Sequence, residues 1–331
     1  MAHDFTAVKV LSRWLILLAF AGLAVGSIAA ALLAGSVDLV WQDLFVADRT
    51  QSNAILFQLR LPRALTAFGC GALLALSGAL MQVLLRNPLA DPYILGVSGG
   101  GAVAALGATM LSLASWWIPV GAFIGASLST LLVFLLAHRQ GVWSAERLLL
   151  TGVTLASGWG AAISFMLSIA PDRDLRGMIF WLMGDLSHGD SPTLACGAAL
   201  VGLIVARLHA RELNLLGRGE AAAASLGVET RRLRNIIFIL GAGMTAIAVS
   251  VGGAIGFVGL VVPHAVRMVV GSDHRWLLPV SALAGGALLV LADTVARTAA
   301  APQQLPVGVI TALIGVPLFL FLLQRSYRRA C

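Results

Sequence analysis

Long apolar runs, separated by short polar or charged stretches, cover almost the whole chain. A helix needs about 20 apolar residues to cross a bilayer. We therefore predict ten membrane-spanning helices, near residues 14–34, 64–84, 93–113, 117–137, 148–168, 193–208, 234–252, 255–270, 278–297 and 306–324. The eighth contains Pro263 and His264, so it is predicted to bend or break. No room is left for a soluble domain, so residues 1–331 are expected to form a single transmembrane domain.

The composition agrees with an all-α polytopic membrane protein. Of 331 residues, 59% are hydrophobic and 11% are charged, against about 25% charged residues in an ordinary soluble domain. The mean hydropathy is +0.93. The lipid bilayer is therefore the expected surrounding of most of this surface.

The basic residues are distributed unevenly between the loops. With both termini in the cytoplasm, sixteen of the 22 Lys and Arg residues fall on the inner side and six on the outer side. This asymmetry is what the positive-inside rule predicts for an even number of spans. The net charge of +7 thus reflects topology in a bacterial inner membrane. No basic stripe with interleaved aromatic residues is present, so nucleic acid is not an expected partner.

The chain lacks the residues for ATP hydrolysis. The glycine-rich stretch Gly96–Gly101 resembles a phosphate cradle, but a P-loop needs a lysine followed by Ser or Thr. Lys9 is the only lysine in the sequence, and Val10 follows it. The chain is therefore predicted not to be an enzyme, and any ATP must be hydrolysed by a partner subunit.

Two other function classes are tested by the positions of ionisable residues. An ion-coupled secondary transporter, the alternative class, usually holds such residues near the bilayer midplane, but here the acids avoid the span centres. Asp293 precedes Arg297 by one helical turn and is predicted to pair with it. A membrane-embedded enzyme would need clustered His, Asp or Glu, and no such cluster is visible. The three cysteines show no metal spacing, so neither a cofactor nor a metal is expected.

Glycines within the predicted spans are interpreted as close helix packing. The run Gly69-Cys-Gly71 in the second span is echoed by Gly241-Ala-Gly243 in the seventh. These two spans run in opposite directions in the predicted topology. The echo therefore gives weak inverted-repeat character to the fold.

Several motifs resemble the iron-chelate (siderophore and haem) and cobalamin permease family of type II ABC importers. Arg60-Leu-Pro-Arg63 is followed by GCGALLALSGALMQVLLRNPLADPYILGVSGGG, which ends at Gly101. Further matches, in the same order, are RLLLTGV (147–153), FWLMGDL (180–186), GEAAAASLGV (219–228), GFVGLVVPHAVR (256–267) and LPVGVITALIGVPLFLFLL (305–323). They cover most of the chain from about residue 55 onward.

The resemblance implies a permease with about ten helices in each subunit. It implies a homodimer around a central pathway, two cytoplasmic ATPase subunits, and a periplasmic substrate-binding protein that docks outside. By position, Arg60, Arg63 and Arg297 would receive acidic residues of the binding protein. Guanidinium groups pair well with carboxylates and steer docking. Snorkelling of arginines at helix ends is the alternative.

The longest polar insertion on the predicted cytoplasmic side, residues 207–234, resembles the coupling segment of the family. That segment is two short helices that sit in a cleft of the ATPase. The expected coupling residues, small or apolar except for one acid, are Gly219, Glu220, Ala223, Leu226, Gly227 and Val228. A solvated loop is the alternative, but it would expose apolar side chains.

Two further segments resemble functional parts of the family. Asn87 and Leu89, in a proline-bracketed turn after the second span, match the cytoplasmic gate. A purely structural turn is the alternative. Residues 171–190 resemble the short outer helix at the pathway entrance.

The substrate is the least determined part of the prediction. Members of the family carry haem, ferric siderophores or cobalamin, and no residue here separates them. The predicted function is import of an iron chelate, haem or a ferric siderophore, by alternating access. Cobalamin import is the alternative within the same family.

Overall fold

A computed structural model describes residues 2–35, 55–137, 145–187 and 192–330. Within these ranges the chain forms thirteen α-helices, a π-helical turn and a 3-10 turn, with no strand. The elements are α1 (Ala2–Leu33), η2 (Ile55–Arg60), α3 (Leu61–Leu84), η3 (Pro92–Leu95), α4 (Val97–Met110), α5 (Trp117–Ala137), α6 (Ala145–Ile169), α7 (Asp172–Leu182), α8 (Pro192–Leu208), α9 (Ala210–Leu216), α10 (Glu220–Ser225), α11 (Thr230–Gly252), α12 (Val258–Val270), α13 (His274–Thr298) and α14 (Val307–Ala330).

Every predicted span corresponds to a helix in the structure. Six described helices are apolar and long enough to cross a membrane: α1, α3 with η2, α5, α6, α11 and α13. The bent pair of α8 and α9, with a 63° angle between them, is a seventh candidate, and α4, α12 and α14 supply shorter apolar helices. The all-helical prediction is thus confirmed. Pro263 does not break α12, although the helix has only 13 residues.

The predicted span at residues 93–113 is divided in the structure. Gly96 adopts a φ of 68° and separates η3 from α4. Glycine reaches this left-handed region without the steric penalty of a Cβ atom. The remaining 14-residue helix is about 21 Å long at 1.5 Å per residue. Sequence hydropathy could not detect this division because both parts are apolar.

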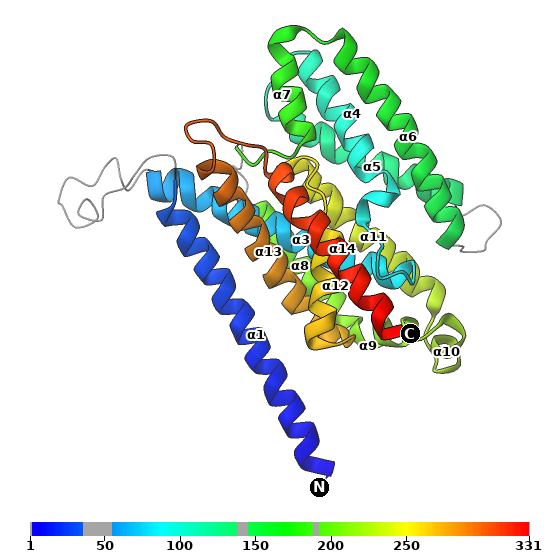
Figure 1. Cartoon of the computed structure of the whole chain (residues 1–331). Coiled ribbons are helices and arrows are strands. Elements are labelled where there is room, and N and C mark those ends of the chain that lie inside the picture. Colours follow the sequence, from blue (N-terminus) through cyan, green and yellow to red (C-terminus); the bar gives the residue numbers. More distant parts are fainter. Residues whose placement is uncertain (1, 36–54, 138–144, 188–191, 331) are drawn as a thin grey trace.

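The helix α3 lies at the centre of the molecule (Figure 1). It contacts α8, α11, α12 and α13. In its most apolar window 89% of residues are buried, against 17% in α1 and 11% in α6. A second group, α4 to α7, packs mainly through α4 and joins the centre where α5 contacts α11. The core is therefore built around α3, while most residues of α1 and α6 are not buried within this single copy.

Glycines allow α3 to approach its neighbours backbone to backbone. A Cβ atom on Gly71 would collide with the carbonyl of Gly285 in α13, and one on Gly78 would collide with Gly259 in α12. Small residues are the usual means of such close packing in membranes. The packing interpretation of these glycines is confirmed.

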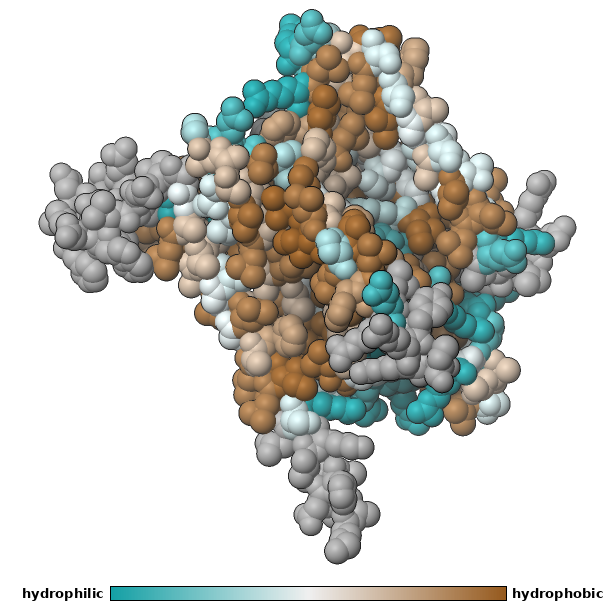
Figure 2. Space-filling view, in the orientation of Figure 1, coloured by the Kyte–Doolittle hydropathy of each residue, from teal (hydrophilic) through white to brown (hydrophobic). Residues whose placement is uncertain are grey.

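The two ends of the helical bundle differ in what they carry. The helices α9 and α10 lie at the end where α1 begins and α14 ends, and α7 lies at the opposite end (Figure 1). Apolar residues cover the middle of the face in Figure 2, with hydrophilic residues gathered toward both ends. This distribution fits a protein that spans a bilayer.

Candidate functional site

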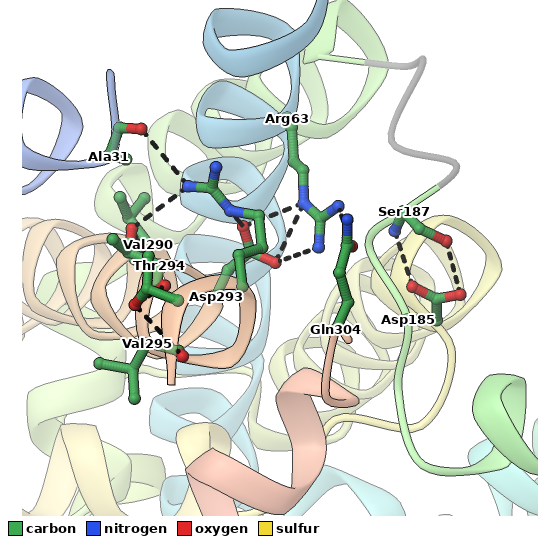
Figure 3. Close-up of polar contacts among 11 residues, drawn as sticks. Ala31, Arg63, Asp185, Ser187, Val290, Asp293, Thr294, Val295 and Gln304 are labelled. Atoms are coloured by element: carbon green, nitrogen blue, oxygen red, sulfur yellow. Dashed lines mark hydrogen bonds and ion pairs between the residues drawn. The ribbon is translucent and has the colours of Figure 1, made fainter. Parts of the chain in front are cut away.

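The Asp293 cluster, formed by Asp293 with Arg60, Arg63 and Arg297, lies where α3 begins and α13 ends. Arg63 Nε is 3.2 and 3.1 Å from the two carboxylate oxygens of Asp293, and Arg63 Nη2 is 2.8 Å from Oδ1 (Figure 3). Arg297 Nε donates to Asp293 Oδ2 at 3.0 Å. One buried carboxylate therefore binds two guanidinium groups, which is the geometry of a strong ion pair.

The same cluster caps the end of α1. Arg60 Nη1 donates to the carbonyl oxygens of Leu32 and Leu33 at 2.8 and 3.3 Å. Arg297 Nη2 contacts the carbonyl of Ala31 at 3.4 Å (Figure 3). The last carbonyls of a helix lack partners within it, and its C-terminus carries partial negative charge. The arginines thus hold the end of α1 against α3 and α13.

The structure brings together all three arginines predicted to dock a binding protein. The pairing of Asp293 with Arg297 is confirmed. Of the three, Arg60 and Arg297 are buried, whereas the side chain of Arg63 is 14% exposed and also binds Gln304 at 2.9 Å. The docking role itself stays a prediction. No local pattern predicts the Arg63–Asp293 pair, because the two residues lie 230 positions apart.

The Glu220 cluster lies at the other end of α3. Arg86, just past the end of α3, donates to Glu220 Oε2 at 3.1 Å, and Arg234 of α11 also pairs with that oxygen. The hydroxyl of Thr230 lies 3.4 Å from Glu220 Oε1. These three partners join α10 to both α3 and α11. Glu220 was predicted from the sequence, but its partners were not: Arg86 lies 134 positions away, and Arg234, 14 positions away, is on a different helix.

An open groove of about 780 Å³ runs beside this cluster. Its lining includes Arg86, Arg218, Glu220, Ala224 and Thr230. Small side chains and two arginines give it a basic, shallow wall that a partner could approach closely.

The predicted coupling residues lie on and around α10. The segment does form two short helices, α9 and α10. Ala223 is fully buried, whereas Leu226 is 66% exposed. Gly219 and Gly227, with φ of 125° and 81°, bracket the helix, and Val228 is partly buried. Gly219 and Glu220 line the groove, and Leu226 directly follows α10. The coupling role remains a prediction.

Asn87 and Leu89 lie in a tightly hydrogen-bonded turn, residues 86–91, which we call the gate turn. Asn87 Oδ1 accepts from Leu89 N at 2.9 Å, and Ala90 N donates to Asn87 O at 3.1 Å. Asp91 accepts from Tyr93 N at 2.8 Å. Burial raises the pKa of Asp91 to about 6, although the hydrogen bond from the Tyr93 amide opposes this. Both predicted gate residues are partly buried, and their gating role stays a prediction.

The predicted outer helix is present as α7, although residues 188–190 of that segment lie outside the described residues. For metal chemistry, no group of three His, Cys, Asp or Glu side chains is placed to hold an ion in the part of the chain that the structure describes.

Comparison with known proteins gives one consistent class of relatives. A profile described as the FecCD transport family matches residues 16–325. The cobalamin import system permease protein BtuC of Halobacterium salinarum is 46% identical over 283 residues, which covers 84% of this chain and 76% of that protein. The hemin transport system permease protein HmuU of Yersinia pestis is 43% identical over 283 residues, covering 82% and 84%.

Solved structures agree with these relatives. A chain described as a metal-chelate type ABC transporter in an inward-facing conformation aligns with a TM-score of 0.83 and 33% identity, covering 94% of this chain and 99% of that one. PsaBC from Streptococcus pneumoniae aligns with a TM-score of 0.58 and 14% identity, which is a likeness of fold alone.

Proposed function

Since the chain belongs to the FecCD transport family, and is therefore a permease of an ABC importer, we propose that it moves an iron chelate from the periplasm into the cytoplasm by alternating access. The proposed cargo is haem or a ferric siderophore. The observation that carries the importer assignment is the match over residues 16–325, which leaves almost none of the chain outside the family.

The chain is a transport subunit, and separate subunits supply its ATPase activity. Permeases of this kind pair with ATPase and substrate-binding components. We propose that two copies form the pathway together, with both termini on the cytoplasmic side. The exposed apolar surface that one copy presents supports this, because lipid or a second copy must cover it.

Two cargo classes have support from relatives. The hemin permease of Yersinia pestis supports an iron chelate, and the metal-chelate type transporter supports a metal chelate of either class. The cobalamin permease of Halobacterium salinarum, at 46% identity, supports cobalamin as the second candidate. The sequence identities to the cobalamin and hemin permeases, 46% and 43%, are close. They therefore support a bulky metal chelate as the class of cargo without separating the two candidates.

The Asp293 cluster is proposed as the docking site for the binding protein. Arg63 and Arg297 share the single carboxylate of Asp293, so this group of three residues keeps a positive charge that complements acidic residues of a partner. Arg63 is the most exposed of the three arginines. It would make the direct contact, while Arg60 and Arg297 hold the surrounding helix ends in place.

The groove beside α10 is proposed as the ATPase contact, through Gly219, Glu220, Ala223, Leu226, Gly227 and Val228. The gate turn, with Asn87 and Leu89, is proposed to close the pathway on the cytoplasmic side. It lies directly beside that groove, since Arg86 belongs to both.

The testing experiment is uptake by proteoliposomes that contain this chain and its ATPase, with the binding protein supplied outside. Haem, a ferric siderophore and cobalamin are compared in parallel, each with and without ATP. We expect ATP-dependent uptake of haem or the siderophore, and loss of it in Arg63→Glu. Cobalamin uptake alone would replace the proposed cargo. Uptake driven by a proton or sodium gradient without the ATPase would overturn the proposal.

A further inference from the structure

Glu220 is the side chain that ties the short helix α10 to the end of α3 and to α11. Arg86 and Arg234 both bind the same oxygen of its carboxylate. The side chain of Glu220 is 41% exposed, and that of Arg86 is 44% exposed. Ion pairs in such surroundings are weak and re-form readily because water screens them. The attachment is therefore specific in geometry but easily broken.

Arg86 is part of the gate turn and has little freedom to move separately from it. Its backbone adopts a φ of 49°, and its amide donates to Val83 O at 3.2 Å. Asn87 N donates to Gln82 O at 3.1 Å, which fastens the turn to the last turn of α3. A displacement of the Arg86 side chain is thus passed to residues 87–90 through a hydrogen-bonded backbone.

The flanks of α10 allow it to shift. Gly219 and Gly227 lie at its two ends with positive φ, and no Cβ atom restricts either of them. The buried Ala223 provides the apolar contact of the helix. A partner that presses on α10 can therefore move it as a unit about these two glycines.

We propose that the Arg86–Glu220 pair is the link through which α10 moves the gate turn, with Arg234 as the fixed anchor on α11. The side chain of Arg234 is only 11% exposed, so it holds its position while α10 shifts. The carboxylate of Glu220 then pairs with one arginine or the other. The side chain of Arg86 moves when its ion pair with Glu220 forms or breaks. Arg86 is thus a positioning residue for the gate. This inference rests on the proposed function and adds the mechanical connection between its two inner sites.

Two further hydrogen bonds hold the end of α3 in place beside the gate turn. Gln82 donates to the carbonyl of Leu260 at 3.1 Å and accepts from Arg267 at 3.1 Å. Both partners belong to α12, so the last turn of α3 is held there while the gate turn lies beyond it. Motion of α10 is therefore expected to act on the turn itself and not on the whole of α3.

The test measures the gate turn directly in the assembled complex of this chain with its ATPase and binding protein. Leu89→Cys serves as the reference and is labelled with a water-soluble maleimide, with and without ATP plus vanadate. Arg86→Gln, Glu220→Gln and their combination are made in this reference. Arg275→Gln removes an equal charge elsewhere at the same end of the molecule and is the matched control. Co-purification with the ATPase reports assembly for each variant.

We expect nucleotide to change the labelling rate of the reference about fivefold, and each single variant to reduce that change to less than about twofold. The combined variant is expected to keep as much of the nucleotide-dependent change as either single variant, because one substitution already breaks the ion pair. Reversing all three charges, by Arg86→Glu with Glu220→Arg and Arg234→Glu, is expected to restore the change.

The inference alone would be overturned if nucleotide did not change the labelling rate of the assembled reference. It would also be overturned if the combined variant lost more of the nucleotide-dependent change than either single variant. Loss of the response in Arg275→Gln would also overturn it, since charge and not the pair would then matter. A chain that never assembles with an ATPase would overturn the proposed function and this inference together. ATP-dependent uptake of cargo, measured separately, distinguishes these cases.

Discussion

The two ends of α3 carry the same kind of ion pair in opposite surroundings. At one end Asp293 binds Arg63 and Arg297, and its side chain is 2% exposed. At the other end Glu220 binds Arg86 and Arg234, and its side chain is 41% exposed. The Asp293 carboxylate joins α3 to α13, and the Glu220 carboxylate joins α10 to the end of α3 and to α11. The main difference between the two clusters is their degree of burial.

This difference assigns the two clusters different mechanical roles. Breaking a buried pair leaves charges without water or partners and is costly. An exposed pair contributes between about 0 and 1 kcal/mol and opens freely. The Asp293 cluster is therefore expected to behave as a permanent joint, and the Glu220 cluster as one that opens during the transport cycle.

The largest effect is expected from Asp293→Asn, which leaves the buried Arg297 and the partly buried Arg63 without their carboxylate. Such a loss typically costs about 3–5 kcal/mol. Glu220→Gln, the matched substitution at the other end, is expected to cost about 1 kcal/mol or less. Thermal unfolding of both variants in the same detergent measures the difference. Equal losses would remove the distinction between the two clusters.

A smaller effect is expected from a substitution in α3, the helix that connects the two clusters. Gly78→Ala places a methyl group against the backbone of Gly259, and overpacking of this kind costs about 1–3 kcal/mol. Gly158→Ala in α6 is the control, because no atom lies within 4 Å of the added group. Thermal unfolding again supplies the measurement. A stable Gly78→Ala protein would show that α3 can shift sideways between its ends.

Substitution of Arg63 tests whether the Asp293 cluster also acts on a partner. Arg63→Gln is expected to weaken affinity for the binding protein about tenfold, or about 1.4 kcal/mol. The affinity of the wild-type chain should also fall with added salt, because exposed charges are screened. Binding measured on nanodiscs at two salt concentrations checks both statements. If Arg63→Gln lowers the stability of the protein but leaves its affinity for the binding protein unchanged, the role of Arg63 is structural.

An effect of a different kind, on the pH dependence of stability, is expected at the gate turn. Burial raises the pKa of Asp91 to about 6 from the usual 3.8. The folded protein thus binds this proton more tightly than the unfolded chain, so the contribution of Asp91 to stability falls as pH rises from about 4 to 6 and is then constant. Asp91→Asn is expected to flatten this slope. Thermal unfolding at pH 4.5 and 7 compares the two proteins, and identical slopes would contradict the assignment.

Local patterns in the sequence were sufficient for most of the fold. Each predicted span became a helix because twenty apolar residues have no other stable state in lipid. The Asp293–Arg297 pair was also accessible, because residues one helical turn apart face the same side. Glycines indicated close packing correctly at Gly71 and Gly78, whereas no atom lies within 4 Å of a Cβ added at Gly158.

Local sequence patterns could not predict the Asp293 and Glu220 clusters. Arg63 and Asp293 are separated by 230 positions, and Arg86 and Glu220 by 134. No local period encodes which remote helix ends will meet. Burial is likewise a property of the assembled bundle, so the contrast between Asp293 and Glu220 became visible only in the structure.

The brevity of α10 has a consequence for how the complex can be followed in solution. It has six residues, and Gly219 supplies no side chain to cap its first amides. A helix of this length gains almost nothing from its own hydrogen bonds. Its amides are therefore expected to exchange rapidly with heavy water in the isolated subunit and to slow once an ATPase covers the groove. Deuterium uptake by this one peptide would then report, without any label, whether the energy-supplying subunit is bound.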